Sequence, residues 1–308
     1  MSAATDPAIL GAKRRPATVS RIAAGVDGYP GGNDAVVLAA AIAHVTQAEL
    51  MLVAVHPDPL VVMPEEMNWK SLEKQSAALL AEVRDSLAPH ARSVVETGLS
   101  VPRALERVVR REHRDLLVVG SSRHGPEGRV RIGKRTRQLL CHFKCALAIA
   151  PRGMLNNPDH KFRRIGVGYD GGSESEAALA LAGSIALAAG AELHLCGVVD
   201  DRVPPIGWSS VLTTGGAAVR RWEDAVLAET ASLRERALAG AKAIGANAHL
   251  EVLRGRPADA LLKLSAEMDL LVIGSRRWGA VARLLLGSTG EALAHDAACP
   301  LLVVPRPG

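Results

Sequence analysis

The chain repeats itself, and this duplication constrains its fold more than any other feature of the sequence. The run IAAGVDG from Ile22 returns as IGVGYDG from Ile165, and DLLVVGS from Asp115 returns as DLLVIGS from Asp269. The spacing of two glycines is also kept, because 13 positions separate Gly120 from Gly133 and Gly274 from Gly287. The 308 residues therefore predict two copies of one domain, each of about 150 residues.

Each copy alternates the signals of strands and helices. In the second copy, short apolar runs that read as strands lie at 165–168, 192–199, 249–253, 270–273 and 301–304. Helical patterns lie between them, at about 174–189, 219–244, 257 onward and 290–297. This alternation predicts an α/β fold, with two tandem Rossmann-like domains. Each would be a five-stranded parallel sheet sandwiched by helices, with an antiparallel contact at one edge as the only departure.

The boundaries follow from the repeat. We expect a disordered tail at 1–18, a first domain at 19–153, a linker at 154–162 and a second domain at 163–308. The apolar runs Leu147–Ala150 and Leu301–Val304 are equivalent, and uncovered apolar edge strands tend to pair. The sequence thus predicts a pseudo-dimer within the chain, joined through these last strands, and leaves room for a homodimer.

Composition argues against two classes of partner. The net charge is +5, but basic and acidic residues are interleaved, and only 3% of residues are aromatic, so we expect no nucleic-acid binding. No apolar run approaches the 18 residues of a membrane span, and no signal-peptide pattern follows the first methionine. The four cysteines form no CxxC spacing. These patterns predict a cytoplasmic protein without membrane contact.

The segment most informative about function joins a strand to a helix in the second copy. Gly274 closes a strand, and Gly287, Ser288 and Thr289 stand where the next helix should begin. Glycine permits a close approach of the backbone to a ligand, and the amides of a helix N-terminus hold phosphate oxygens. The pattern predicts an anion site at the carboxyl edge of the sheet.

This pattern resembles the signature of the universal stress protein family, in which glycines and a Gly-Ser/Thr pair bind the ribose and phosphates of ATP. The resemblance covers both copies and implies ATP, with or without Mg²⁺, as the ligand. It places the adenosine at Asp170, the adenine at the backbone of Val198, and the phosphates at Gly274, Gly287, Ser288 and Thr289. One departure is Arg277, which stands where the family's second glycine would be and would either grip a phosphate or fill the site.

The first copy departs further from the signature. The resemblance carries over to Asp27, Val55, Gly120 and Gly133, but Arg123 replaces the second glycine and Lys134 replaces the serine. A basic run continues through Arg129, Arg131, Arg135 and Arg137, which attracts phosphate or simply forms a solvated face. We expect the second copy to bind nucleotide more tightly than the first.

Two similar motifs point elsewhere. The run GRVRIGK from Gly128 to Lys134 has the spacing of a Walker A loop, but Arg135 occupies the position of the Mg²⁺-binding hydroxyl. The run DGGSES from Asp170 to Ser175 resembles the loop of ATP pyrophosphatases, with Asp and Glu replacing its first Ser and its Asp. We expect no P-loop in the first run, which also lacks an immediately preceding strand, and we take the second run as a mark of a related architecture without adenylating chemistry.

Isolated reactive residues predict little chemistry. Cys141 and Cys145 are one helical turn apart, and we expect buried helix cysteines before a metal pair; His194 and His249 read as packing or edge residues. His44 and His56 are expected near the ligand edge of the first copy. No catalytic set and no metal site can be assembled, so we expect a regulatory protein of stress or dormancy. The alternatives are a slow ATPase or nucleotide α-hydrolase, and a scaffold with lapsed sites.

Overall fold

The computed structural model describes residues 18–56, 69–142, 145–201, 217–275 and 286–305. The predicted tail at 1–18 lies outside the described residues except for its last position.

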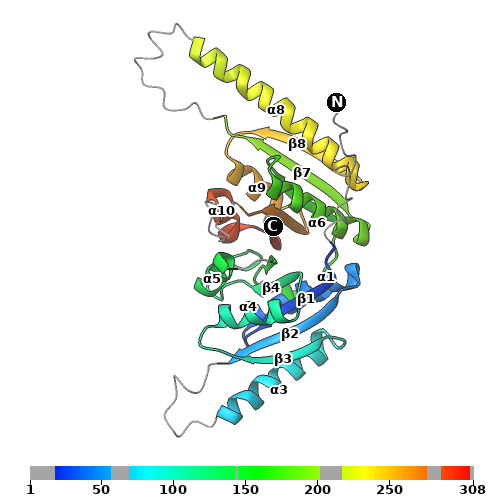
Figure 1. Ribbon diagram of the computed structural model, residues 1–308, viewed down its shortest axis with the longest axis vertical. Helices are drawn as coiled ribbons and strands as arrows, with labels where there is room; N and C mark the ends of the chain where they lie inside the picture. The colour runs from blue at the N-terminus through cyan, green and yellow to red at the C-terminus, as the bar shows by residue number, and fades with distance from the viewer. Residues whose placement is uncertain (1–17, 57–68, 143–144, 202–216, 276–285, 306–308) are drawn as a thin grey trace, which may run out of the picture.

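Ten strands form one sheet that runs through the whole molecule (Figure 1). The strands are β1 (Arg21–Val26), β2 (Glu49–His56), β3 (Arg92–Thr97), β4 (Leu116–Gly120), β5 (Ala146–Ala150), β6 (Arg164–Tyr169), β7 (Glu192–Val199), β8 (Ala248–Arg254), β9 (Leu270–Gly274) and β10 (Leu301–Val304). Their order in the sheet is β3-β2-β1-β4-β5-β10-β9-β6-β7-β8. The second half of this order mirrors the first, as the duplication requires.

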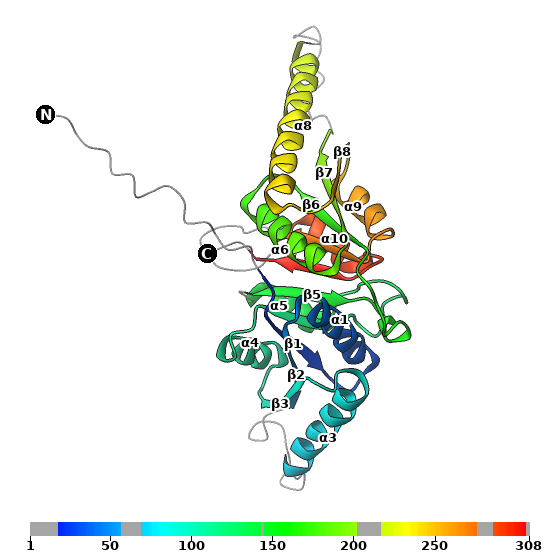
Figure 2. The ribbon, with the colours of Figure 1, turned by 90° about the vertical axis from the view of Figure 1, so that its right-hand side faces the viewer.

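Every pairing within a repeat is parallel, and the two repeats join through an antiparallel pair of their last strands. In that pair Leu302 lies opposite Ala148 and Val303 opposite Leu147. Figure 2 shows β5 beside the red terminal strand at the middle of the molecule. The predicted fold class and the predicted pairing of the last strands are both confirmed.

Helices cover both faces of the sheet. They are α1 (Pro30–Thr46), α3 (Trp69–Leu87), α4 (Val101–Arg111), α5 (Lys134–His142), α6 (Ser173–Ala189), α8 (Ala217–Ile244), α9 (Pro257–Ser265) and α10 (Ser288–Asp296), with a 3-10 turn, η2 (Met154–Asn156), between the repeats. One hydrophobic core lies under α1, α3, α6 and α8, and the other lies under α4, α5, α9 and α10. Strands near the centre are therefore buried on both faces, which explains why β5 and β10 are uninterrupted apolar runs.

Local signals set the ends of these elements. Gly190 takes a left-handed conformation, with φ of 65°, and ends α6. Pro257 opens α9, where its missing N–H has no cost. The strand and helix boundaries expected for the second repeat agree with the observed ones within about two residues.

Part of the basic run in the first repeat holds the second repeat. The N–H groups of Val130 and Ile132 donate to the carbonyls of Ala297 and Ala294, at the end of α10, over 2.8 and 2.9 Å. The guanidinium of Arg129 donates to the carbonyl of Asp296 over 2.7 Å. These bonds satisfy carbonyls that a helix end otherwise leaves to solvent.

A second contact joins equivalent positions of the two repeats. One terminal nitrogen of Arg137, in α5, donates to both carboxylate oxygens of Glu291 in α10, over 2.8 and 2.9 Å. The second terminal nitrogen of Arg137 lies 3.0 Å from Nε2 of His295. Arg137 and Glu291 each lie four positions after the second motif glycine. The two copies have thus diverged to opposite charges where they meet.

The linker is fixed to the first repeat. Asp34 of α1 is buried, and its carboxylate accepts the N–H groups of Gly153 and Leu155 over 3.0 and 2.8 Å. Further along the linker, the side chain of Phe162 packs into the core beneath α1 and α6. The connection is therefore part of the folded structure.

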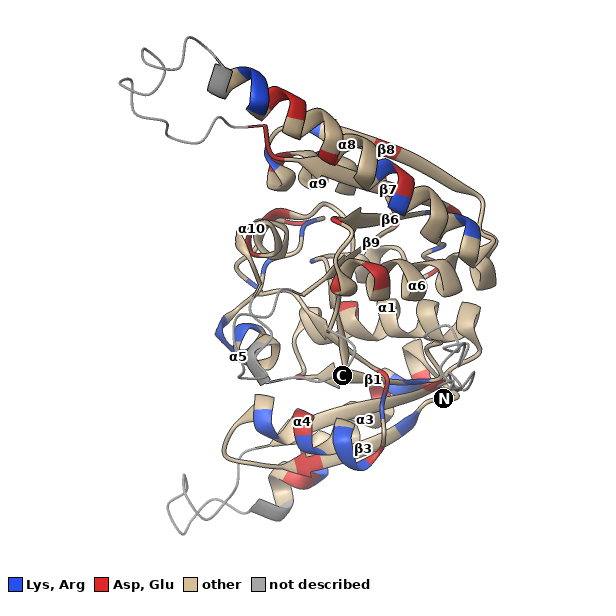
Figure 3. Cartoon of the chain, turned by 45° about the horizontal axis from the view of Figure 1, so that its top comes forward, with Lys and Arg blue, Asp and Glu red and all other residues tan. Residues whose placement is uncertain are grey.

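Charged residues of both signs lie on the long helix of the second repeat. Basic and acidic segments alternate along α8 (Figure 3). Among the described helices, none is long and apolar enough to cross a membrane.

Candidate functional site

A pocket opens in the second repeat where the carboxyl ends of β6, β7 and β9 meet the start of α10. Its lining includes six of the seven residues that the sequence singled out in this repeat: Asp170, Val198, Gly274, Gly287, Ser288 and Thr289. The seventh, Arg277, lies outside the described residues. Strand order places β6 between β7 and β9, so crossover connections on either side leave this crevice open.

The turn after β6 supplies a carboxylate to the pocket. Asp170 follows the strand directly, and its Oδ1 accepts the N–H of Gly172 over 2.9 Å. Gly171 has φ of +75°, a conformation that glycine adopts without strain. Arg236 of α8 donates to the carbonyl of Gly171 over 3.3 Å. The turn therefore holds Asp170 at the mouth of the pocket as α6 begins.

The end of β9 lies very close to the start of α6. A Cβ built on Gly274 would lie 2.6 Å from the backbone carbon of Glu174, which no real side chain tolerates. Gly274 lines the pocket, but the packing of the chain against itself already demands glycine there. This glycine therefore does not by itself indicate a ligand.

The start of α10 has features that suit an anion. Gly287 is the N-cap residue, and among the residues that the structure describes no side chain caps this end of the helix. The N–H groups of the first turn, at Ser288, Thr289 and Gly290, are therefore left for a ligand or solvent, and the helix dipole favours a negative charge there. The hydroxyls of Ser288 and Thr289 stand at the same place.

One wall of the pocket is apolar. Val198 of β7, Leu261 of α9 and Ile273 of β9 form this wall, and Pro257 lies at the start of α9. An apolar wall beside a phosphate-binding helix start suits a flat heterocycle that carries phosphates. Tyr169 also lines the pocket, and its hydroxyl donates a hydrogen bond to the carboxylate of Glu176. Burial raises the pKa of this phenol well above its usual range.

The first repeat has the same scaffold. Val26 pairs with Ala54 in the sheet as Tyr169 pairs with Gly197, so Val55 and Val198 are equivalent by register. Asp27 follows β1 as Asp170 follows β6, and its Oδ1 accepts the N–H of Tyr29 over 3.1 Å. Sequence reasoning therefore aligned the two sites correctly.

Two features of the first site were missed. A Cβ on Gly120 would overlap the carbonyl oxygen of Gly31, so the start of α1 lies directly against the end of β4. The guanidinium of Arg123 lies 5.5 Å from the centre of the Tyr29 ring, a cation–π contact at the mouth of the site. Arg123 thus has a partner within its own repeat, and Tyr29 carried no signal that reveals the pair.

The loop before α5 is tied at several points. The N–H of Ser122 donates to the carbonyl of Arg131, and Arg152 donates to the carbonyl of Gly125, both over 2.7 Å. Lys134 opens α5 with an exposed side chain, where the second repeat has Ser288. A Cβ on Gly133 would meet nothing closer than 3.8 Å, so packing does not explain this glycine.

The two histidines expected at the ligand edge lie at opposite edges of the sheet. His56 ends β2, is buried, and its Nε2 lies 3.1 Å from the hydroxyl of Thr97. His44 lies in the last turn of α1, so the expectation for it was wrong. Because α1 starts at the ligand edge and runs back along the sheet, its last turn reaches the opposite edge.

The Walker-like segment is not a phosphate loop of that kind. It starts eight residues after β4 ends at Gly120, and its Gly128 donates to the carbonyl of Arg152 over 2.8 Å. Among the described cysteines, Cys145, Cys196 and Cys299 are free thiols. Burial raises the pKa of the Cys145 thiol to about 12, which leaves it protonated at neutral pH.

The model of the universal stress protein family matches the chain twice, at residues 18–151 and 161–305. A universal stress protein of Thermus aquaticus is 32% identical over 148 residues, which are 46% of this chain and 98% of that protein. A universal stress protein of Mycobacterium tuberculosis is 33% identical over 195 residues, or 61% of this chain. The match spans about three fifths (60%) of the length of that relative.

A solved structure matches almost the whole chain. The universal stress protein of Archaeoglobus fulgidus aligns over 93% of this chain and 98% of its own, with a TM-score of 0.64 and 17% sequence identity. At that identity the likeness concerns the fold, and it includes both repeats.

Proposed function

The chain belongs to the universal stress protein family, and we propose that it is a regulatory protein that binds ATP or a related adenine nucleotide in its second repeat. One observation carries the proposal. The pocket at the carboxyl ends of the strands of the second repeat joins a helix start with two hydroxyls to an apolar wall and a strand-end carboxylate. These are the groups that phosphates, a base and a ribose need.

Each part of the pocket suits one part of the nucleotide. The N–H groups and hydroxyls of Ser288 and Thr289 would bind the phosphates, which Mg²⁺ accompanies when ATP is the ligand. Asp170 would accept hydrogen bonds from the ribose. The backbone of Val198 would face the adenine, with Leu261 and Ile273 against its plane.

We propose a role in stress or dormancy without fast catalysis. Phosphoryl transfer needs a metal held on the phosphates and an oriented nucleophile. The carboxylate of Asp170 accepts a backbone N–H of its own turn, and Glu174 accepts the hydroxyl of Ser173 over 2.9 Å. We expect ATP turnover well below roughly 1 per second. A rate above that value, abolished by Ser288→Ala, would show that the protein is an enzyme.

The second candidate function is a scaffold whose two sites no longer bind nucleotide. One observation favours this candidate. Gly120 and Gly274 are demanded by helix packing, so their presence would persist after a site lost its ligand. Gly133 has no such packing reason, because a Cβ there would meet nothing closer than 3.8 Å, and this supports a working site over a lapsed one.

Native mass spectrometry of the freshly purified full chain separates these candidates. We expect an added mass of one adenine nucleotide per chain that Gly287→Val removes. A chain that stays free of nucleotide after incubation with millimolar ATP would support the scaffold. A nucleotide retained by Gly287→Val but lost in Gly133→Val would place the main site in the first repeat.

We also propose that the two repeats act as their own dimer in the cytoplasm. Glu291 meets Arg137 of the other repeat, whereas a symmetric pairing of two second repeats would bring Glu291 against Glu291. The opposite charges of Arg137 and Glu291 at this contact thus favour pairing within one chain. A homodimer would then use another surface, and sedimentation of the purified chain distinguishes monomer from dimer.

A further inference from the structure

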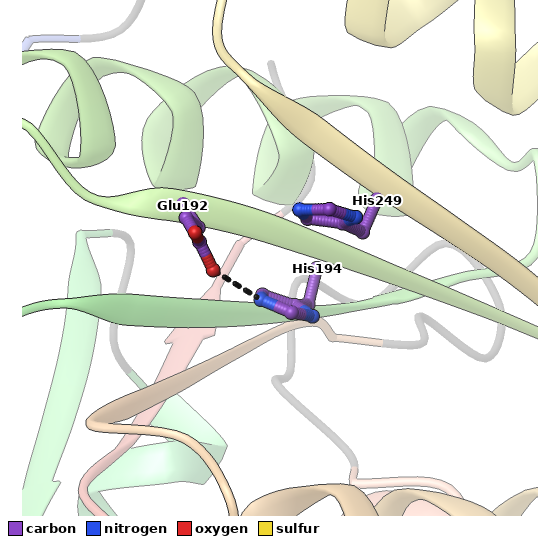
Figure 4. A group of neighbouring side chains, drawn as sticks. All are labelled: Glu192, His194 and His249. Atoms are coloured by element: carbon purple, nitrogen blue, oxygen red, sulfur yellow. Dashed lines mark hydrogen bonds and ion pairs between the residues drawn. The ribbon is translucent and has the colours of Figure 1, made fainter.

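A cluster of metal-ligand side chains lies at the outer edge of the second repeat, away from the nucleotide pocket. Glu192 and His194 project from the same face of β7, because residues two apart in a strand share a face. His249 lies directly opposite His194 on β8, the last strand of the sheet. Figure 4 shows the two imidazole rings side by side, with the carboxylate of Glu192 directed at His194.

The donor atoms already lie close together. Nε2 of His194 is 3.4 Å from Oε2 of Glu192, and the two ring centres are 5.0 Å apart at an interplanar angle of 25°. One donor atom from each residue lies within 4.8 Å of the other two. A tetrahedral Zn²⁺ with bonds of about 2.1 Å keeps its ligands about 3.4 Å apart, so small side-chain rotations complete the site.

The surroundings leave room for those rotations. Glu192 and His249 are exposed and His194 is half-buried, so the rings can turn without displacing the core. On the neighbouring strand β6, Gly166 pairs with His194, and Leu264 and Met268 pack over this glycine. The imidazole of His194 therefore has a hydrophobic neighbour on one side and a second imidazole on the other, while its donor edge meets the carboxylate.

The ligand types select the metal. Two imidazoles and a carboxylate are the protein ligands of many Zn²⁺ sites, and water completes the coordination. Cys196 follows on the same face of β7, where it is buried, and Glu251 of β8 pairs with it in the sheet. Glu251 therefore adds a negative charge beside the cluster, which favours a cation.

We propose that Glu192, His194 and His249 form a Zn²⁺ site that ties the edge strand β8 to β7. The site shares no residue with the lining of the candidate nucleotide pocket, whose nearest member along β7 is Cys196, about 7 Å beyond His194. The chemistry is that of a structural or sensing site, in which the ion adds a bridge between two strands that are already paired through their backbone ladder. No redox or group transfer is involved.

The test measures Zn²⁺ binding by the full chain, prepared without a histidine tag and stripped with a chelator. Competition against a chromophoric chelator should give one bound Zn²⁺ per chain. We expect His194→Ala and His249→Ala each to weaken binding by at least about tenfold, and Glu192→Gln to weaken it less. His90→Ala is the matched control, because His90 is an exposed histidine far along the chain, and it should bind as the unmodified protein does.

A spectroscopic readout complements the titration. Co²⁺ bound in place of Zn²⁺ should show the intense visible bands of a tetrahedral site, and His249→Ala should lose them. Circular dichroism verifies that each variant is folded; because His249 is exposed on the edge strand, its replacement leaves the core intact. Zn²⁺ should also raise the melting temperature of the unmodified chain and of His90→Ala, but not of His194→Ala.

Three results would overturn the proposal. The unmodified chain could fail to bind Zn²⁺ in competition with the chelator. The double variant His194→Ala, His249→Ala could bind as tightly as the unmodified chain. Cys145→Ser could remove the bound ion, which would place the metal at the thiols of the first repeat. Each result is independent of ATP binding, so failure here leaves the proposed function untouched.

Discussion

The two repeats share a backbone and differ where the motif helix begins. After the second motif glycine, the first repeat continues with Lys134, Arg135 and, at the fourth position, Arg137, whereas the second continues with Ser288, Thr289 and Glu291. Helix α5 uses Arg137 to hold the other repeat, and α10 presents uncapped amides and hydroxyls to a pocket. The comparison teaches that both copies of a duplicated helix can take part in the contact between the repeats, while only one of them begins with hydroxyl groups that suit a phosphate.

The largest effect is expected from variants that block the candidate phosphate position of each repeat in turn. Gly287→Val puts a branched side chain where phosphate passes, and we expect ATP affinity to fall at least a hundredfold, about the loss of two charge-assisted hydrogen bonds. Gly287 has φ of −64°, so valine is compatible with the backbone. Isothermal titration calorimetry measures the change.

The matched control is Gly133→Val, which should leave the tighter site intact. A Cβ atom at this position would meet Ser122 at ordinary contact distance. If Gly133→Val removes the tighter site instead, the roles of the two repeats are reversed.

A second test separates glycines that serve packing from those that serve ligands. Gly120→Ala and Gly274→Ala force a methyl group into the backbone of Gly31 and Glu174, and we expect each to lower the free energy of unfolding by about 1–3 kcal/mol. Chemical denaturation without nucleotide measures this loss. Gly133→Ala should unfold at nearly the same denaturant concentration as the unmodified chain; a comparable loss there would mean that all motif glycines are structural.

A third test replaces the first residue of each of the helices α5 and α10. Ser288→Ala removes one donor to the phosphate, and we expect ATP affinity to fall about tenfold. Lys134→Ser gives the first repeat the hydroxyl it lacks and should strengthen its weaker binding. Titration of both variants checks the pair. Unchanged affinity in Ser288→Ala would mean that the amides of α10 suffice.

The smallest expected effect concerns the contact between the repeats. Arg137 and Glu291 are each partly exposed, so we expect their coupling to be about 0.2–1 kcal/mol. A double-mutant cycle of Arg137→Ala and Glu291→Ala, read by chemical denaturation, measures it. The variant Arg137→Glu should cost more, because it places like charges together. Restoration by Glu291→Arg in the same chain would confirm that the pair acts across the interface.

Sequence reasoning predicted much of the fold because its signals were local. The duplication, the alternation of strands and helices, and stops such as Gly190 depend on periodicity and backbone conformation within a few residues. The pairing of β5 with β10 was also predictable, since two equivalent apolar edges have few other ways to be covered.

The candidate site was predictable only in outline. The resemblance named Asp170, Val198 and the Gly287–Ser288 pair, and the structure brings them into one pocket. It gave no sign of the wall formed by Leu261 and Ile273, because apolar residues in a helix or strand look alike whether they line a pocket or a core. The contact of Arg137 with Glu291 was hidden for the same reason: a charge run carries no record of what it faces.

The sequence by itself determined the two repeats, their α/β architecture and the edge of the sheet at which the candidate pocket lies, because these follow from periodicity, chain order and handedness. Only the tertiary structure decided which glycines serve packing, which arginines hold the other repeat, and that Glu192, His194 and His249 converge on one edge. Such facts depend on register between strands and on distances between residues far apart in the chain. Spacing along one strand shows that Glu192 and His194 share a face, but only the pairing of β7 with β8 places His249 beside them.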